Sequence, residues 1–155
     1  MMRSNYMFVK NNFRLWFIGL VLALGASTAI AGTSGVEVTN SRIRLLPGDL
    51  PLAGYFDVHN TGKQAVSLTG ASSADFGMVM MHKSMHKNGE ASMMMVDKID
   101  VAPGKTVQFA PGGYHLMLMH RKKDLKVGDN VLINLDFSNG QKMDVQFKVG
   151  GAGTE

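Results

Sequence analysis

Residues 131–149 read VLINLDFSNGQKMDVQFKV, two alternating apolar and polar runs on either side of a short polar turn. One face of the first run would carry Val131, Ile133, Leu135 and Phe137, and one face of the second Met143, Val145, Phe147 and Val149. A period of two is typical of a β-strand with one buried face. The turn Ser138-Asn139-Gly140 favours a hairpin. This stretch therefore predicts two antiparallel strands at the end of the domain.

Short apolar segments between turn signals continue upstream, with no convincing helical period. The predicted strands are residues 36–40, 43–46, 53–59, 65–70, 75–81, 93–96, 106–109 and 115–119. Lys87-Asn88-Gly89-Glu90 is the strongest two-residue hairpin signal, and it should fold Met93–Val96 back against the strand that carries His82. Short strands at such regular spacing predict an all-β fold, an antiparallel Greek-key β-sandwich or barrel.

The first 31 residues have the pattern of a secretory signal. Arg3, Lys10 and Arg14 precede an apolar run over residues 15–25, and small residues end in Ala29-Ile30-Ala31. A basic lead, a short apolar segment and an A-x-A site are typical of a signal peptide cleaved after Ala31. The alternative is an uncleaved anchor, for which the apolar run is short. We therefore expect a signal peptide over residues 1–31 and one exported domain over residues 32–155, without a membrane span.

Charge and cysteine content exclude several classes of function. The chain has 16 basic and 12 acidic residues, and loss of residues 1–31 removes three basic ones and leaves 13 against 12. The high pI of the whole chain is thus largely a property of the leader, and no basic stripe for nucleic acid remains. The chain has no cysteine. A thiol nucleophile, a dithiol redox motif and a thiolate metal site are excluded.

Nine of the 13 methionines and three of the five histidines lie within residues 78–119. Because side chains alternate along a strand, each strand presents its donors to one face. The groups that share a face are His115, Met117 and Met119; Met78, Met80 and His82; and Met93 and Met95. Leu116 and Leu118 lie on the opposite side of residues 115–119, which predicts that this side is the core. Three strands can thus bring soft donors to one side of the sheet.

These donors favour a soft metal ion. A thioether is soft and neutral, and soft ligands select Cu(I). Zinc prefers thiolate, imidazole and carboxylate, while calcium and magnesium need clustered oxygen atoms. His115 and Met117 carry the strongest signal, because both share the polar face of a strand whose other face is leucine.

Methionine is also a gap-filling core residue. Three methionines are interpreted as core: Met78, Met81 and Met143. Met94 is ambiguous, and Met85 and Met119 are surface residues or secondary donors. Three histidines are interpreted as structural or solvated: His59, His86 and His120.

The donor spacing His82-x10-Met93-x21-His115-x-Met117 resembles the signature of the periplasmic copper(I) chaperone family, the PCu(A)C domain. Residues 54–62, GYFDVHNTG, resemble that family's Y-F-x-x-x-N-x-G strand and turn. Residues 109–119, FAPGGYHLMLM, resemble its P-G-G-x-H-x-M-L core. The similarity extends over most of the chain after the leader.

The resemblance implies a cupredoxin-like β-sandwich that binds one Cu(I) through His82, Met93, His115 and Met117. It implies a periplasmic protein that passes copper to a partner, either cytochrome c oxidase subunit II with its CuA site or another copper-accepting protein. We expect the protein to be a monomer. Five further methionines could compete as donors: Met80, Met81, Met94, Met95 and Met119. Residues 150–155 contain neither Met nor His, so no second Cu(II) site is expected there.

Four alternatives differ in what they require. A copper buffer or resistance protein without a dedicated recipient would use the same residues. An electron-transfer cupredoxin needs a Cys thiolate, which the chain lacks. An enzyme would need a catalytic array, and no Ser-His-Asp set or carboxylate pair stands out, so we expect no enzymatic activity. In an adhesion module the methionine cluster would be core alone.

Overall fold

The computed structural model describes residues 35–87 and 89–153. Its ten strands are β1 (Val36–Arg44), β2 (Leu52–Asn60), β3 (Val66–Ser72), β4 (Phe76–Lys87), β5 (Glu90–Met95), β6 (Ile99–Val101), β7 (Thr106–Phe109), β8 (Tyr114–Arg121), β9 (Asn130–Phe137) and β10 (Lys142–Gly150). The predicted signal peptide lies outside the described residues. Within the described ranges no helix is long and apolar enough to cross a membrane.

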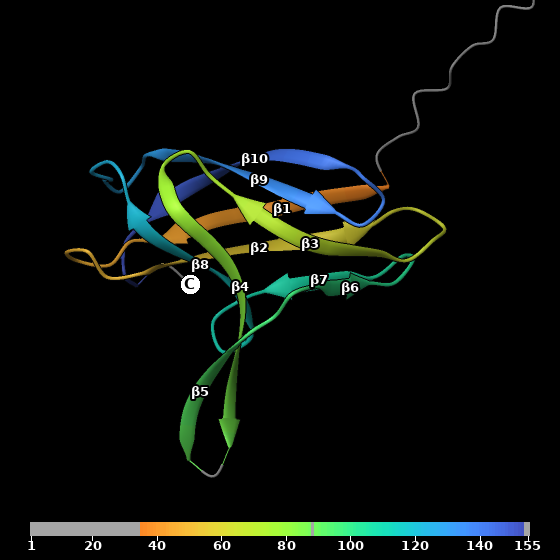
Figure 1. Cartoon of the computed structure of the whole chain (residues 1–155), viewed down its shortest axis with the longest axis horizontal. Coiled ribbons are helices and arrows are strands. Elements are labelled where there is room, and N and C mark those ends of the chain that lie inside the picture. The colour runs from red at the N-terminus through yellow and green to blue at the C-terminus, as the bar shows by residue number, and fades with distance from the viewer. Residues whose placement is uncertain (1–34, 88, 154–155) are drawn as a thin grey trace, which may run out of the picture. The chain divides into compact units, whose positions relative to one another are not determined.

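The strands form one sheet in the order β5-β4-β8-β7-β2-β1-β10-β9-β3-β6 (Figure 1). The sheet curls, so that β3 near one end of this order contacts β4 near the other end. The predicted all-β sandwich is confirmed, but the sheet is mixed, because β1 pairs with β10 in parallel and β7 with β8 in parallel. Hairpin turns require antiparallel neighbours. β1 and β10 are the first and last strands. Because no hairpin turn connects them, they can pair in parallel.

Alternating faces of the strands build the core. Phe56 of β2 stacks on Phe109 of β7 with ring centroids 4.1 Å apart, and it meets the edge of Phe147 of β10 at 5.4 Å. Leu116 and Leu118 of β8 are fully buried on the same side. Each such side chain contributes about 1.5–3 kcal/mol through burial. The core therefore fixes which face of β8 remains for other functions.

Two predicted strands differ from those observed. The predicted strands 36–40 and 43–46 are replaced by a single strand, β1, which ends at Arg44 and whose register shifts between Thr39 and Arg42. At this bulge Asn40 has a φ of 55° and donates from Nδ2 to Asp57 Oδ2 at 2.6 Å. The bulge interrupts the alternation and makes one strand read as two. β6 was not predicted because it has only three residues.

β5 and the last residues of β4 extend away from the other strands (Figure 1), whereas β4 up to Lys83 is paired with β8. The pairing of Lys87 with Glu90 leaves two positions for the turn, and Gly89 adopts a φ of 82°. The predicted two-residue hairpin is confirmed. Every residue of β5 is exposed. β5 is therefore held by its backbone hydrogen bonds to β4 and contributes little to the core.

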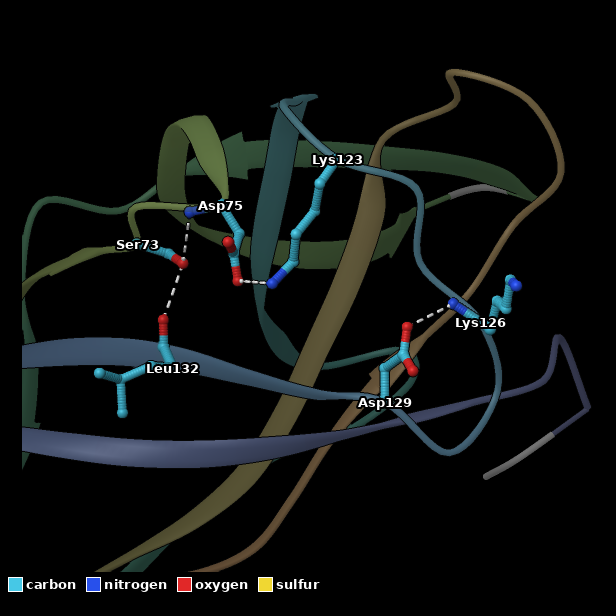
Figure 2. A network of polar contacts seen from close by, with 6 residues as sticks. All are labelled: Ser73, Asp75, Lys123, Lys126, Asp129 and Leu132. Atoms are coloured by element: carbon cyan, nitrogen blue, oxygen red, sulfur yellow. Dashed lines mark hydrogen bonds and ion pairs between the residues drawn. The ribbon is translucent and has the colours of Figure 1, made fainter.

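The other end of the β4–β8 pair is tied down by polar contacts (Figure 2). Lys123, after β8, forms an ion pair of 2.8 Å with Asp75, before β4, and the Lys122 amide donates to the Asp75 carbonyl at 2.9 Å. Ser73 donates from its hydroxyl to the Leu132 carbonyl of β9 at 2.7 Å. These contacts hold the start of β4 and the end of β8 together.

Asn60 explains the N-x-G part of residues 54–62. Its side chain is buried, with an exposed fraction of 1%. Nδ2 donates to the carbonyls of Gln64 and Val101 at 2.8 and 2.9 Å, and Oδ1 accepts from the Gly62 amide at 2.9 Å. A Cβ at position 62 would lie 3.1 Å from Oδ1. The motif therefore serves the fold by tying β2 to β6.

Candidate metal centre

The predicted metal ligands come from three adjacent strands, with β4 between β5 and β8. His82 of β4 is directly opposite Met95 of β5 and directly opposite His115 of β8. We call each set of directly opposed residues on the face that carries His82 a rung. Residues of one rung project from the same face of a sheet and lie within side-chain reach of each other. The rung of His82 therefore carries three potential donors.

The neighbouring rungs add thioethers on that face. Met80 is opposite Met117, one rung toward the start of β4, and Met93 is opposite Ser84, one rung toward the hairpin turn. The register thus confirms the predicted facial grouping, and it brings the four predicted ligands to neighbouring positions on one face. Whether these four bind the ion stays a prediction.

The two imidazoles lie close together. Their ring centroids are 5.9 Å apart and the rings are tilted by 78°. His115 is 7% exposed, and its Nδ1 lies 3.2 Å from the Gly113 carbonyl. Because a carbonyl only accepts, Nδ1 carries the proton, which leaves the lone pair of a neutral ring on Nε2. A backbone carbonyl that fixes the tautomer in this way is typical of histidines that bind metals.

One ring nitrogen of His82 makes no hydrogen bond to the described residues. Its Nδ1 is buried and has no hydrogen-bond partner among the described residues. Burial lowers the pKa of His82 from 6.5, and the charge of His115 lowers it further. Both effects favour the neutral imidazole, the form that binds a metal. A buried nitrogen without a partner costs free energy, which a bound cation would offset.

The Pro111-Gly112-Gly113 turn shapes the site through one carbonyl. Gly112 has a φ of 79°, which glycine adopts without strain. The Gly113 carbonyl accepts from the Ser84 amide at 3.0 Å as well as facing His115 Nδ1. This carbonyl ties the base of the hairpin to the imidazole of β8. The P-G-G-x-H motif therefore combines the turn with orientation of the His115 imidazole.

The chemistry of the donor set fits a soft cation. Among the described residues there is no group of three or more His, Cys, Asp or Glu side chains that could hold a metal ion. An ion between His82 and His115 would therefore need thioethers to complete its ligands, and thioethers select Cu(I). Met117 is half-buried, whereas Met93 is 61% exposed. The site is thus more accessible from the hairpin.

The other methionines and histidines divide between core and surface. Met81 is buried in the core and Met143 packs against it, as predicted. Core placement of Met78 was wrong: it is 44% exposed. It shares the parity of Met80 and so projects from the outer face of the sheet. His86 and His120 are exposed. Nδ1 of His59 is hydrogen-bonded to Thr106 Oγ1 at 2.9 Å.

Sequence reasoning missed two supporting features. The first is the Gly113 carbonyl, which no residue type reveals. The second lies on the opposite face of the β4–β8 pair, where the Lys83 ammonium sits 5.0 Å from the ring centre of Tyr114. These residues oppose each other in the ladder beside the histidine rung. Their residue types, a cation and an aromatic, were the available signal.

The sequence profile described as "Putative lipoprotein LpqE-like" matches residues 36–149. The chain belongs to the LpqE-like family. The chain is also similar to "Putative lipoprotein Lxx21020" of Leifsonia xyli subsp. xyli. The two are 31% identical over 138 residues, which are 87% of this chain and 82% of the relative. The match covers every strand that carries the centre.

The chain is also similar to solved structures of copper-binding PCuAC proteins. The copper-bound PCuAC domain from PmoF2 is 25% identical with a TM-score of 0.63, and it covers 76% of this chain and 93% of that domain. The solution structure of CuI-DR1885 from Deinococcus radiodurans is 30% identical with a TM-score of 0.61, over 77% of this chain and 83% of that protein. The resemblance to the PCuAC family is confirmed, and the fold is that of its copper-binding domains.

Proposed function

We propose that this chain is a periplasmic copper chaperone that binds one Cu(I) tightly through His82, Met93, His115 and Met117. The observation that carries the proposal is the rung in which His82 faces His115, because it places a buried, unpartnered imidazole nitrogen beside an imidazole of fixed tautomer. The copper named for the PmoF2 domain and for CuI-DR1885 supports the choice of ion. The role is one of binding and transfer, without catalysis.

Release of the ion follows from the donor set. Two imidazoles and two thioethers are neutral, so no anionic ligand holds the cation. Met93 is the most exposed of the four, and His115 the least. A partner's ligand can therefore replace Met93 first, while His115 stays oriented by the Gly113 carbonyl until the ion leaves. Transfer then proceeds by stepwise ligand exchange at the hairpin side.

We propose delivery to a copper-accepting protein, with the CuA site of cytochrome c oxidase subunit II as the expected recipient. The alternative is a copper buffer or resistance protein without a dedicated recipient. A deletion strain distinguishes the two. Loss of oxidase activity that added copper restores supports delivery, whereas copper sensitivity with normal oxidase activity supports buffering.

Export to the periplasm, with cleavage after Ala31, is part of the proposal. The family description as a lipoprotein supports an exported protein. The chain has no cysteine to which a thioether-linked lipid could be attached, so we propose a free domain after cleavage. Sequencing the N-terminus of the protein from a periplasmic extract tests this, and a start at Gly32 is expected.

An anaerobic Cu(I) titration against a chromophoric chelator tests the binding site. His115→Ala should weaken the tight site by at least 100-fold, because it removes a ligand and its oriented nitrogen. His86→Ala is the matched control, since His86 lies on the same face of β4 but is exposed near the hairpin turn. Equal affinity of the His115 variant and the wild type would refute the proposed site.

A further inference from the structure

The thioether rungs continue past the histidines. Beyond the rung of Met80 and Met117, Met78 of β4 is directly opposite Met119 of β8. Every residue on this face of β4 from 78 to 82, and of β8 from 115 to 119, is therefore a methionine or a histidine. The proposed chaperone site uses His82, His115 and Met117 from this face. Three thioethers remain without an assigned role.

These three methionines are not part of the core. The core on this strand pair is built by the opposite parity, with Met81, Leu116 and Leu118 buried and Val79 packed against them. Met80 and Met119 are half-buried, yet neither belongs to the core or to the partly buried residues that pack on it. Met78 is 44% exposed. A packing role does not account for them.

We propose that Met78, Met80 and Met119 form a second, weaker Cu(I) site that consists of thioethers alone. Directly opposed side chains have Cβ atoms about 5 Å apart, and successive rungs on one face are about 7 Å apart. Methionine is unbranched and has three rotatable bonds, so three sulfur atoms from two such rungs can converge on one ion. Soft, neutral donors of this kind take Cu(I) and reject zinc and hard cations.

The strand pair is well fixed at this end. The Lys123–Asp75 ion pair and the bond from the Lys122 amide hold the end of β8 to the start of β4, just beyond the rung of Met78 and Met119. The backbone is therefore preorganised, and only the side chains have to move when the ion binds. The second site lies next to Met117, a proposed ligand of the tight site. The inference, which rests on the proposed function, therefore predicts that a second Cu(I) binds directly beside the first.

The two sites should respond differently to pH. A thioether has no proton to lose, so affinity at the methionine site should be constant between pH 7.5 and 5.5. The tight site uses imidazole ligands, which bind a metal ion only in their neutral form, so protons compete with the ion there. Its affinity should fall over the same range. This difference separates a second site from a spread of ligands around a single one.

The test is an anaerobic Cu(I) titration of the full chain with a competing chelator, in wild type and in a Met78→Leu/Met119→Leu variant. Leucine keeps the side-chain volume and removes the sulfur. The wild type should bind two ions, and the variant should keep the tight one and weaken the second at least tenfold. Met81→Leu is the matched control, because Met81 lies on the same strand but in the core. It should bind both ions.

Each other result overturns the inference in a recognisable way. One ion in both wild type and variant refutes the second site and leaves the proposed function intact. Loss of the tight ion in the double variant assigns these methionines to the first site and also refutes the inference. Absence of Cu(I) binding to the wild type refutes both proposals. X-ray absorption of the second equivalent should add sulfur neighbours only, and added nitrogen neighbours would contradict a site made of thioethers.

Discussion

Separate replacement of Met93 and Met95 by leucine identifies which hairpin methionine binds the ion. In its rung, His82 lies between Met95 and His115. Met95 is therefore on the far side of His82 from the space between the two imidazoles. Met93 lies one rung toward the hairpin turn and Met117 one rung the other way, so their thioethers can approach the imidazole pair from opposite sides. We expect Met93 to be the ligand.

The expected magnitudes follow from exposure. Met93 and Met95 are 61% and 60% exposed. Because leucine has a similar volume, each substitution should change the free energy of unfolding by less than about 0.5 kcal/mol. A loss of affinity then reports the lost sulfur. Met93→Leu should raise the Kd for Cu(I) at least tenfold, which is about 1.4 kcal/mol, and Met95→Leu less than about threefold.

The assay is anaerobic competition with a chromophoric Cu(I) chelator, with urea denaturation of each variant in parallel. Equal denaturation midpoints establish that the folds match. If Met95→Leu weakened binding as much as Met93→Leu or more, Met95 would bind the ion and the expected role of Met93 would be refuted. If neither changed the affinity, the hairpin would supply no ligand.

Three further predictions concern the strands that support the centre. Because the pKa of His82 is lowered from 6.5 in the folded protein, the unfolded chain binds more protons than the folded chain just below pH 6.5. The free energy of unfolding should therefore fall as the pH falls below 6.5. Thermal unfolding at several pH values measures this dependence, and His82→Gln should weaken it. Gly77→Ala should cost about 1–3 kcal/mol in urea denaturation, because its Cβ would lie 2.8 Å from that of His120; an unchanged midpoint would contradict this contact. Leu116→Ala should cost about 2–5 kcal/mol, because its side chain is fully buried, against about 1 kcal/mol or less for the 41% exposed Leu132 as control.

The alternation of residues was enough to predict the faces of the central strands. Leu116 and Leu118 marked the core side of β8, and the register places His115 and Met117 on the other side, as predicted. The hairpin turn also followed from local chemistry, since Asn-Gly at a two-residue turn depends on only a few residues. Predictions succeeded where the deciding contacts are close in sequence.

Features that depend on distant contacts were not predictable. The parallel pairing of β1 with β10 joins the two ends of the domain and leaves no local signal. Met78 was assigned to the core because methionine commonly is, and only the pairing with Met119 places it outside. The order Met95, His82, His115 within one rung likewise needed the register of three strands. The resemblance to the PCu(A)C signature implied Met93, but it did not show that Met95 is opposite His82.

The pairing of the first strand with the last has a consequence for the order of folding. When the chain emerges N-terminus first, β1 is the first strand to appear, but its partner β10 ends at Gly150. The strands of the centre, β4, β5 and β8, are complete by Arg121. Contacts between neighbouring segments form faster than those that close a long loop. The donor-bearing strands can therefore assemble while β1 still lacks one of its neighbours, and the sheet is completed last where the chain begins and ends.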